Sequence, residues 1–205
     1  MTHEGPNTIE EGAVATVEAN ISMSVDGYVT GPNLDRHPGL GEGGEALHAW
    51  TGESRAMDFA FGEERQIAGS VVTSRKVYDE TDGWAAEDGF FRLPVFVVTH
   101  RRHDAVVKGD TSFTFVTQGI ESAIEQARAA AGDKLVHIMG GAGIIQQALA
   151  AGLVDELFLH VAPVLLNVGT RLFEQLGGPI RLERTEVIES LHATHLRYRI
   201  LKGRA

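Results

Sequence analysis

The 205-residue sequence contains no cysteine. Disulfide bonds, thiolate metal sites, iron–sulfur clusters and cysteine nucleophiles are therefore excluded. A chain without cysteine suits a reducing compartment, so we expect a cytoplasmic protein. The sequence also lacks any apolar run near the ~18 residues that a membrane-spanning helix needs, so we expect no membrane partner.

Positive charge is scarce. The chain has 18 Lys and Arg against 28 Asp and Glu, which gives a formal net charge of -10. Binding to nucleic acid requires clustered Lys and Arg, so we expect no nucleic-acid partner. A small anionic ligand is still compatible with this charge, because backbone amides and a few local cations can hold a phosphate.

Two kinds of catalytic motif are missing. The nine histidines form no HExxH pattern, and His192 and His195 fall on a predicted hairpin where their positions face opposite ways. We therefore expect surface or paired histidines and no metal. The Gly-x-Ser-x-Gly elbow of many hydrolases is also absent.

The first half of the chain begins with a polar, acidic stretch. Residues 1–13 are predicted to be a disordered leader, and residues 14–205 a single domain. Apolar residues alternate with polar ones over residues 17–23, which predicts a half-buried strand. Residues 31–44 are rich in glycine and proline and predict a loop. Short helices are expected at residues 45–51 and 56–64.

The remainder alternates between apolar runs and helical periodicity. Strands are predicted at residues 69–73, 94–99, 113–117, 135–139 and 157–166, and helices at residues 120–131 and 144–149. Residues 180–189 and 193–201 predict a final hairpin. This order favours an α/β fold, with a mainly parallel central sheet flanked by helices and a C-terminal antiparallel hairpin.

The most informative segment is a glycine-rich turn between a strand and a helix, Gly140-Gly141-Ala142-Gly143. Glycines let the backbone approach a ligand closely, and the free amides of a helix N-terminus attract phosphate. A P-loop would continue with Gly-Lys-Ser/Thr, whereas Ile144-Ile145-Gln146 follows here. Gln146 also replaces the third glycine of the Rossmann fingerprint. Two interpretations remain, a turn that binds a dinucleotide diphosphate through amides and a strand–helix junction without a ligand.

Residues 139–173 resemble the signature of the dihydrofolate reductase-like superfamily, and in particular the riboflavin biosynthesis reductase, which is the C-terminal domain of the bacterial bifunctional deaminase-reductase. The positions in register are Gly140, Gly141, Gly152, Leu153, Asp155, Glu156, Pro163, Gly169, Leu172 and Phe173. Residues 22–28, 69–78, 94–101 and 119–134 match other parts of the family in the expected order. The resemblance covers about residues 16–175 of the sequence.

The resemblance implies a dihydrofolate reductase-like fold, a homodimer and NADPH lying across the carboxyl ends of the strands. The residues that would hold the diphosphate are Gly140, Gly141, Ala142, Gly143, Ile144 and Ile145. Those that would face the phosphates from the other side are Thr73, Ser74, Arg75 and Lys76. Those near the adenosine ribose and its 2′-phosphate are Thr99, His100 and Arg101.

The implied activity is hydride transfer to a small imine or carbonyl heterocycle, such as a ribosylaminopyrimidine-like or pterin-like substrate. Asp26 is the candidate catalytic residue, since in the resemblance it holds polar groups of the substrate near the nicotinamide. Trp50 and Phe61 are candidates for a stacking wall that binds the substrate. The alternatives are an ordinary Asp-Gly turn at Asp26 and core or surface aromatics at the other two positions.

The chain departs from the family pattern near the expected phosphates. Ser74 stands where the family usually has glycine, and Val77 where it usually has threonine. A missing hydroxyl at Val77 would lose a phosphate hydrogen bond worth about 1.5–3 kcal/mol. Two alternatives therefore stay open: a reductase that uses another reduced carrier such as a deazaflavin, and a non-catalytic protein that binds or senses dinucleotides.

Overall fold

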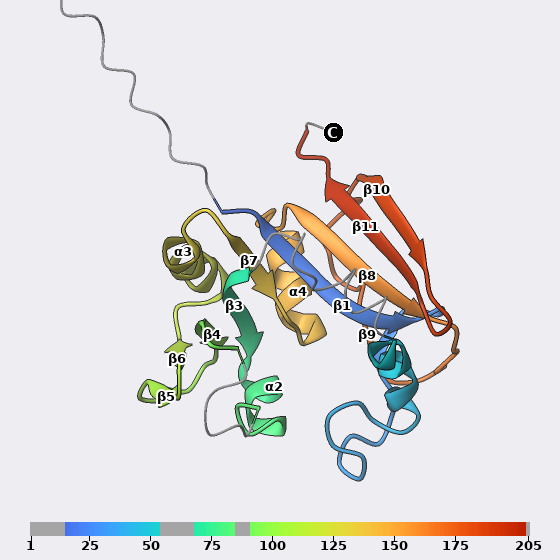
Figure 1. The fold of residues 1–205 in the computed structure, drawn as a ribbon, viewed down its shortest axis with the longest axis horizontal. Coiled ribbons are helices and arrows are strands. Elements are labelled where there is room, and N and C mark those ends of the chain that lie inside the picture. The colour runs from blue at the N-terminus through green and yellow to red at the C-terminus, as the bar shows by residue number, and fades with distance from the viewer. Residues whose placement is uncertain (1–14, 54–67, 85–90, 204–205) are drawn as a thin grey trace, which may run out of the picture.

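A nine-stranded sheet organises the part of the chain that the computed structural model describes, residues 15–53, 68–84 and 91–203 (Figure 1). The order of its strands is β10-β11-β8-β1-β7-β3-β4-β6-β5. The six neighbours from β8 to β6 are parallel, and both ends of the sheet are antiparallel. The predicted fold class is thereby confirmed.

The strands have the following bounds: β1 Val17–Ser24, β3 Ala68–Ser74, β4 Pro94–Val98, β5 Val106–Lys108, β6 Thr111–Val116, β7 Leu135–Ile138, β8 Glu156–Ala162, β10 Leu182–Glu189 and β11 Thr194–Ile200. A separate two-stranded sheet joins β2 (Tyr28–Thr30) to β9 (Thr170–Arg171). The carboxyl ends of β1, β3 and β7 point towards the bottom of Figure 1, where α2 (Arg75–Glu80) and the loop after β2 lie. In open α/β sheets this edge is where ligands bind.

Two amphipathic helices pack on one face of the sheet. In α3 (Ile120–Ala131) and α4 (Ala142–Ala150) the apolar residues recur every three to four positions, so each helix buries one side. Gly132, with a φ of 65°, ends α3 in a conformation that glycine adopts without strain. Both helices share one core cluster with the strands, which contribute Val17, Ala19, Val136, Ile138, Leu157 and Leu159.

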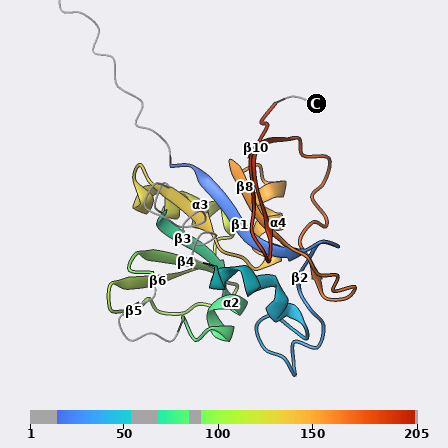
Figure 2. The same ribbon diagram turned by 45° about the vertical axis from the view of Figure 1, so that its right-hand side comes forward.

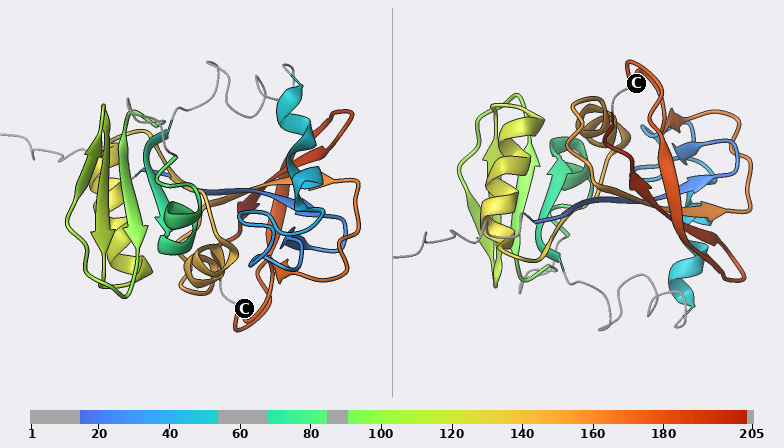
Figure 3. Two further views of the ribbon diagram at one scale, coloured as in Figure 1. Left: turned by 90° about the horizontal axis from the view of Figure 1, so that it is seen from below. Right: turned by 90° about the horizontal axis from the view of Figure 1, so that it is seen from above.

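The other face of β1 and β8 carries polar side chains and is covered by η1 (Gly44–Gly52), a 3₁₀ helix. Figure 3 shows η1 and α4 on opposite sides of these strands. Strand side chains alternate between faces, so the residues of β1 that point away from α4 are those of even number. Buried polar groups gather here, and we refer to Glu18, Asn20, Ser22, His160 and His195 as the polar layer.

The C-terminal hairpin of β10 and β11 lies along β8 and was correctly predicted. Figure 2 shows it at the opposite end of the sheet from β5 and β6. Three other predictions need correction. Strand β8 ends at Ala162 and not at residue 166, because Pro163 has no N–H to continue the ladder. Residues 44–52 form a 3₁₀ helix, and β3 is followed by α2, a helix that was not predicted.

Some expectations fall outside the described residues. The leader at 1–13 and the helix at 56–64 belong to this group. Among the helices of the described ranges, none is both long enough and apolar enough to cross a membrane.

Candidate functional site

The glycine-rich turn lies between β7 and α4 and is fastened to the end of β3. The carbonyl oxygen of Gly140 accepts hydrogen bonds from the backbone N–H and the side chain of two neighbours, Ser74 N at 3.0 Å and Thr73 Oγ1 at 3.0 Å. In return, the N–H of Gly141 donates to Ser74 Oγ at 3.3 Å. The peptide bond between the two glycines is cis. Thr73 and Ser74 thus stabilise the turn by hydrogen bonds to its two glycines.

Ser74 has a structural reason to differ from the usual glycine. Its Oγ accepts hydrogen bonds from Val77 N at 3.2 Å, which caps α2, and from Gly141 N, which begins α4. A serine hydroxyl at an N-cap satisfies an amide that the helix leaves unpaired. Glycine at this position would leave both amides without this acceptor. The hydroxyl therefore joins the starts of two helices at the carboxyl edge.

The start of α4 is the part of the turn that can receive an anion. The helix has no side-chain cap, and a Cβ added at Gly143 would meet nothing within 4 Å. The amides of Ile144 and Ile145 already donate to the Gly141 carbonyl, at 3.0 and 3.4 Å, and their side chains are in the core. The amides of Ala142 and Gly143 are therefore the candidates for diphosphate binding. Ile144 and Ile145 instead stabilise the turn, through their hydrogen bonds to Gly141 and their buried side chains.

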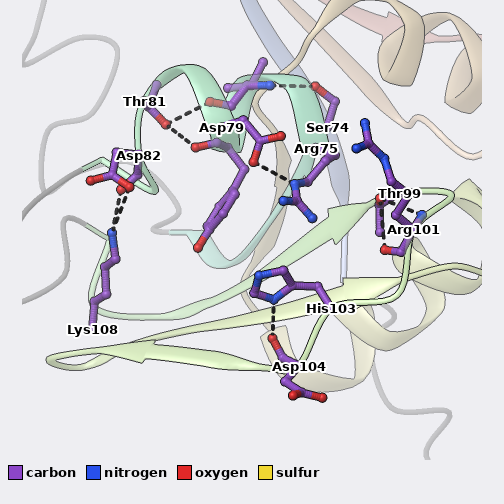
Figure 4. Close-up of polar contacts among 12 residues, drawn as sticks. Ser74, Arg75, Asp79, Thr81, Asp82, Thr99, Arg101, His103, Asp104 and Lys108 are labelled. Carbon is purple, nitrogen blue, oxygen red and sulfur yellow. Dashed lines mark hydrogen bonds and ion pairs between the residues drawn. The ribbon is translucent and has the colours of Figure 1, made fainter.

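Positive side chains lie beside this turn, at the ends of β3 and β4. Figure 4 shows Arg75 Nε donating to Asp79 Oδ1 at 2.7 Å. Its guanidinium lies 5.3 Å from the centre of the Phe115 ring. Lys76 is more exposed and pairs with Glu80 at 3.7 Å. Arg75 is thus held at the carboxyl end of β3, over Phe115 of β6, by an ion pair and by an aromatic ring.

The loop after β4 brings further cations to the same edge. Thr99 is buried, and its Oγ1 accepts the N–H of Arg101 at 3.1 Å, which bends the chain sharply after the strand. His100 and Arg101 are exposed. The ring of His103 lies 4.2 Å from that of Phe115, so Arg75 and His103 contact the same aromatic ring. His103 and Phe115 could not be predicted as neighbours from the sequence, because their proximity depends on the pairing of β4 with β6.

At the end of β1, the Asp26 carboxylate accepts hydrogen bonds from the protein itself. Oδ1 accepts from Ser24 Oγ at 2.6 Å and from Leu166 N at 3.2 Å, and Oδ2 accepts from Asn167 N at 2.8 Å. The hydrogen bond from Ser24 is the main reason that the pKa of Asp26 is lower than usual. Asp26 is therefore ionised at neutral pH and connects the β1–β2 turn to residues 166–167.

Trp50 was predicted to form an exposed wall on which the substrate stacks, and the structure places it in the interior instead. Its side chain is only 2% exposed, its Nε1 donates to Ser22 Oγ at 2.9 Å, and its ring stacks on His160 at a centroid distance of 4.1 Å. A buried indole needs a partner for its N–H, and Ser22 supplies one. Trp50 thus anchors η1 to the polar layer. Phe61 lies outside the described residues.

Residues 15–195 match the family model described as the RibD C-terminal domain. The chain belongs to the RibD C-terminal domain family. Membership of this family supports an oxidoreductase, and the resemblance predicted from residues 139–173 is confirmed. No curated protein sequence matches the chain.

Solved structures show how widely the fold of this RibD-type domain is shared. A putative riboflavin biosynthesis protein from Shewanella sp. PV-4 is 21% identical with a TM-score of 0.70, over 91% of this chain and 99% of that one. Dihydrofolate reductase from Enterococcus faecalis, complexed with NADP(H), is 14% identical with a TM-score of 0.61, over 92% and 98%. A deaminase/reductase from Thermotoga maritima is 12% identical with a TM-score of 0.61, over 92% of this chain and 57% of that one.

The site of this RibD-type domain fits a phosphorylated dinucleotide. An uncapped helix N-terminus faces open space at Gly143, and cationic side chains gather at the ends of β3 and β4 on a chain of net charge -10. By contrast, the described residues contain no group of three His, Cys, Asp or Glu arranged to hold a metal ion.

Proposed function

We propose that this protein is a cytoplasmic NADPH-dependent reductase that transfers hydride to a small imine or carbonyl heterocycle, such as a ribosylaminopyrimidine-like or pterin-like substrate. One observation carries the proposal: the turn at Gly140 and Gly141, fastened by Thr73 and Ser74, presents the start of α4 at the carboxyl edge of the sheet. Family membership agrees with this interpretation.

The protein's part in the reaction is to bind and orient the two reactants. The bound nicotinamide supplies the hydride, so little acid–base chemistry is required of the chain. The amides of Ala142 and Gly143 would hold the diphosphate, assisted by the positive end of the α4 dipole. Arg75 and Arg101 would contact the 2′-phosphate, which favours NADPH over NADH.

Asp26 places the substrate side at the end of β1 in this proposal. Its lowered pKa keeps the carboxylate ionised at neutral pH, so it is not a proton donor. The ionised group adds negative charge to the substrate side, while its oxygens accept hydrogen bonds from Ser24, Leu166 and Asn167. The proton that accompanies the hydride would then come from solvent or from the substrate.

The proposal is tested by two measurements on the purified protein. NADPH is first titrated by fluorescence or calorimetry, with NADH as the comparison. The decay of nicotinamide absorbance is then followed with a panel of aminopyrimidines and pterins. Saturable NADPH binding with turnover of at least one compound is the expected result, whereas no binding of either nucleotide contradicts the proposal.

The same titration distinguishes the two alternatives. Val77 favours a dinucleotide-binding protein without turnover, because its side chain is apolar where the family usually has a hydroxyl, and it lies 3.8 Å from a Cβ built on Gly141. Tight NADPH binding with no oxidation over the whole panel would support that function. Turnover with a reduced deazaflavin and not with NADPH would identify the other carrier.

We also propose a homodimer. The family resemblance supports it, and in the described part of the chain β10 lies at an edge of the sheet with one side open to pairing. Size-exclusion chromatography with light scattering at micromolar concentration should give twice the chain mass of 22.1 kDa. A species of 22.1 kDa alone would exclude the dimer.

A further inference from the structure

Residues 164–172 follow β8, include β9 and cross the carboxyl edge of the sheet. Groups distant in sequence hold this segment in place. The first tie is backbone pairing to the β1–β2 turn: Val25 N donates to Val164 O at 3.0 Å, and Leu172 N donates to Gly27 O at 2.9 Å. Leu172 is fully buried. Both ends of the segment are therefore fixed to the end of β1.

Asp26 is the second tie, and it holds the middle of the segment. Its two carboxylate oxygens accept the N–H groups of Leu166 and Asn167, while Ser24 Oγ donates to Oδ1 from below. Asn167 has a φ of 66°, a conformation that asparagine tolerates better than most residues. Each of the two adjacent N–H groups donates to a different oxygen of the carboxylate, whereas a neutral amide would offer only one acceptor oxygen.

Gln146 is the third tie, and it comes from the opposite half of the site. It lies in the second turn of α4, and its Nε2 donates to the carbonyl oxygens of Arg171 at 3.0 Å and Leu172 at 3.1 Å. The helix whose first turn would receive the diphosphate is thereby joined to β9. Gln146 is also the residue that replaces the third glycine of the Rossmann fingerprint.

We propose that Asp26 and Gln146 are positioning residues for the reaction proposed above: together they fix residues 164–172 between the dinucleotide turn and the substrate side. The inference rests on the proposed function. Asp26 then acts through the segment it holds, since its carboxylate is already occupied by three donors of the chain. Binding of a dinucleotide at the start of α4 is transmitted through Gln146 to residues 171–172, and the segment becomes more rigid.

Near-isosteric variants with matched controls test the inference by amide hydrogen exchange. Gln146→Glu removes both donated hydrogen bonds, and its control Gln147→Glu makes the same change at the next, exposed position of α4. Asp26→Asn removes one acceptor oxygen, and its control is Asp35→Asn, whose side chain is 79% exposed. Without ligand, we expect exchange of the Leu166 and Asn167 amides to rise about five- to tenfold in Asp26→Asn and not in its control.

The addition of NADPH supplies a readout that a merely structural role would not change. In the wild type and in Gln147→Glu, saturating NADPH should slow exchange over residues 164–172 at least threefold. Gln146→Glu should bind NADPH within about threefold of wild type and yet lose this slowing. The inference is overturned if Gln146→Glu exchanges like wild type in both states, or if it loses NADPH binding altogether.

Failure of the proposed function is distinguishable from failure of the inference. If the wild-type chain binds no NADPH, the proposed function fails, and the ligand-free exchange rates alone decide whether the two residues position the segment. Unchanged rates in both variants would then reject the positioning role as well.

Discussion

The Nδ1 atoms of His160 and His195 lie 2.7 Å apart beneath Trp50. His160 Nε2 is 2.9 Å from Asn20 Oδ1, and His195 Nε2 is 3.1 Å from Ser190 Oγ. Since Asn20 Oδ1 can only accept, His160 donates from Nε2 and, when neutral, accepts at Nδ1. His195 then donates from Nδ1 and accepts from Ser190. The two rings can take up one extra proton but not a second, which would set two N–H groups against each other.

This arrangement predicts a loss of stability in mild acid. Burial lowers the pKa of His195 from its ordinary value of 6.5, although the carboxylate of Glu53 opposes the shift. Burial lowers that of His137 as well, against Glu18. The unfolded chain therefore takes up protons first as the pH falls below about 6.5. The free energy of unfolding should be level above this pH and decrease below it, by about 1.4 kcal/mol per pH unit for each proton.

The groups that face the histidine pair come from every element around it. Asn20 on β1 contacts His160, and Glu53, which follows η1, acts on His195. Behind Asn20, Glu18 pairs with His137 on β7 and with Arg197 on β11. The variant His195→Gln removes one of the histidines whose pKa burial lowers, which also include His48 and His137, so its unfolding free energy should fall less steeply between pH 6.5 and 5.5. His192→Gln, at an exposed position of the same hairpin, is the control. Urea unfolding followed by circular dichroism measures both, and equal slopes would contradict the account.

Ser74→Ala should destabilise the protein by about 1–2 kcal/mol, because it removes the cap of α2 and the acceptor for Gly141 N together. Ser74→Thr keeps a hydroxyl and should recover most of the loss. Thermal and urea unfolding at pH 7.5 measure the difference. A loss in Ser74→Ala that Ser74→Thr does not recover would show that the hydroxyl is not the cause.

Gly143→Ala separates stability from ligand binding. The added methyl meets nothing in the protein and favours the helix, so the unfolding free energy should stay level or rise by up to about 1 kcal/mol. The same methyl fills the open space before the α4 amides, and NADPH affinity should fall at least tenfold. Gly178→Ala, another site with nothing within 4 Å, should change neither. Unchanged affinity in Gly143→Ala would place the diphosphate elsewhere.

Arg101→Gln tests the contact to the 2′-phosphate. A charge-assisted hydrogen bond contributes about 1.5–3 kcal/mol, so the Kd for NADPH should rise roughly 10- to 100-fold while the Kd for NADH stays the same. Arg36→Gln, whose side chain is 81% exposed in the loop after β2, is the control. An equal rise for both nucleotides would indicate a general electrostatic effect, and no rise would remove Arg101 from the site.

Much of the fold could be predicted because most of the long elements have a local signal. The apolar alternation of residues 17–23 and the periodicity of residues 120–131 correspond directly to β1 and α3. Elements that depend on contacts between distant parts of the chain could not be predicted. Residues 28–30 and 170–171 are too short to indicate strands by themselves, and they form β2 and β9 only by pairing across the chain.

The candidate site likewise has features that local sequence indicates and contacts that it does not. The turn at Gly140 and Gly141 could be located from local sequence, since a strand, glycines and a helix follow one another. Three contacts join residues far apart in sequence. They are the hydrogen bond from Gly141 N to Ser74 Oγ, the hydrogen bonds that Gln146 donates to residues 171–172, and the stacking of Trp50 on His160. Nothing in a single sequence indicates such pairs. Trp50 was expected at a substrate wall for this reason, and it lies in the interior.

We propose that a reduced nicotinamide dinucleotide binds at the start of α4. A crystal structure of the protein soaked with NADPH tests it most directly. The account predicts diphosphate oxygens within hydrogen-bonding distance of the Ala142 and Gly143 amides, with the 2′-phosphate beside Arg75 or Arg101. A dinucleotide bound elsewhere, or a crystal that takes up none at millimolar NADPH, would contradict it.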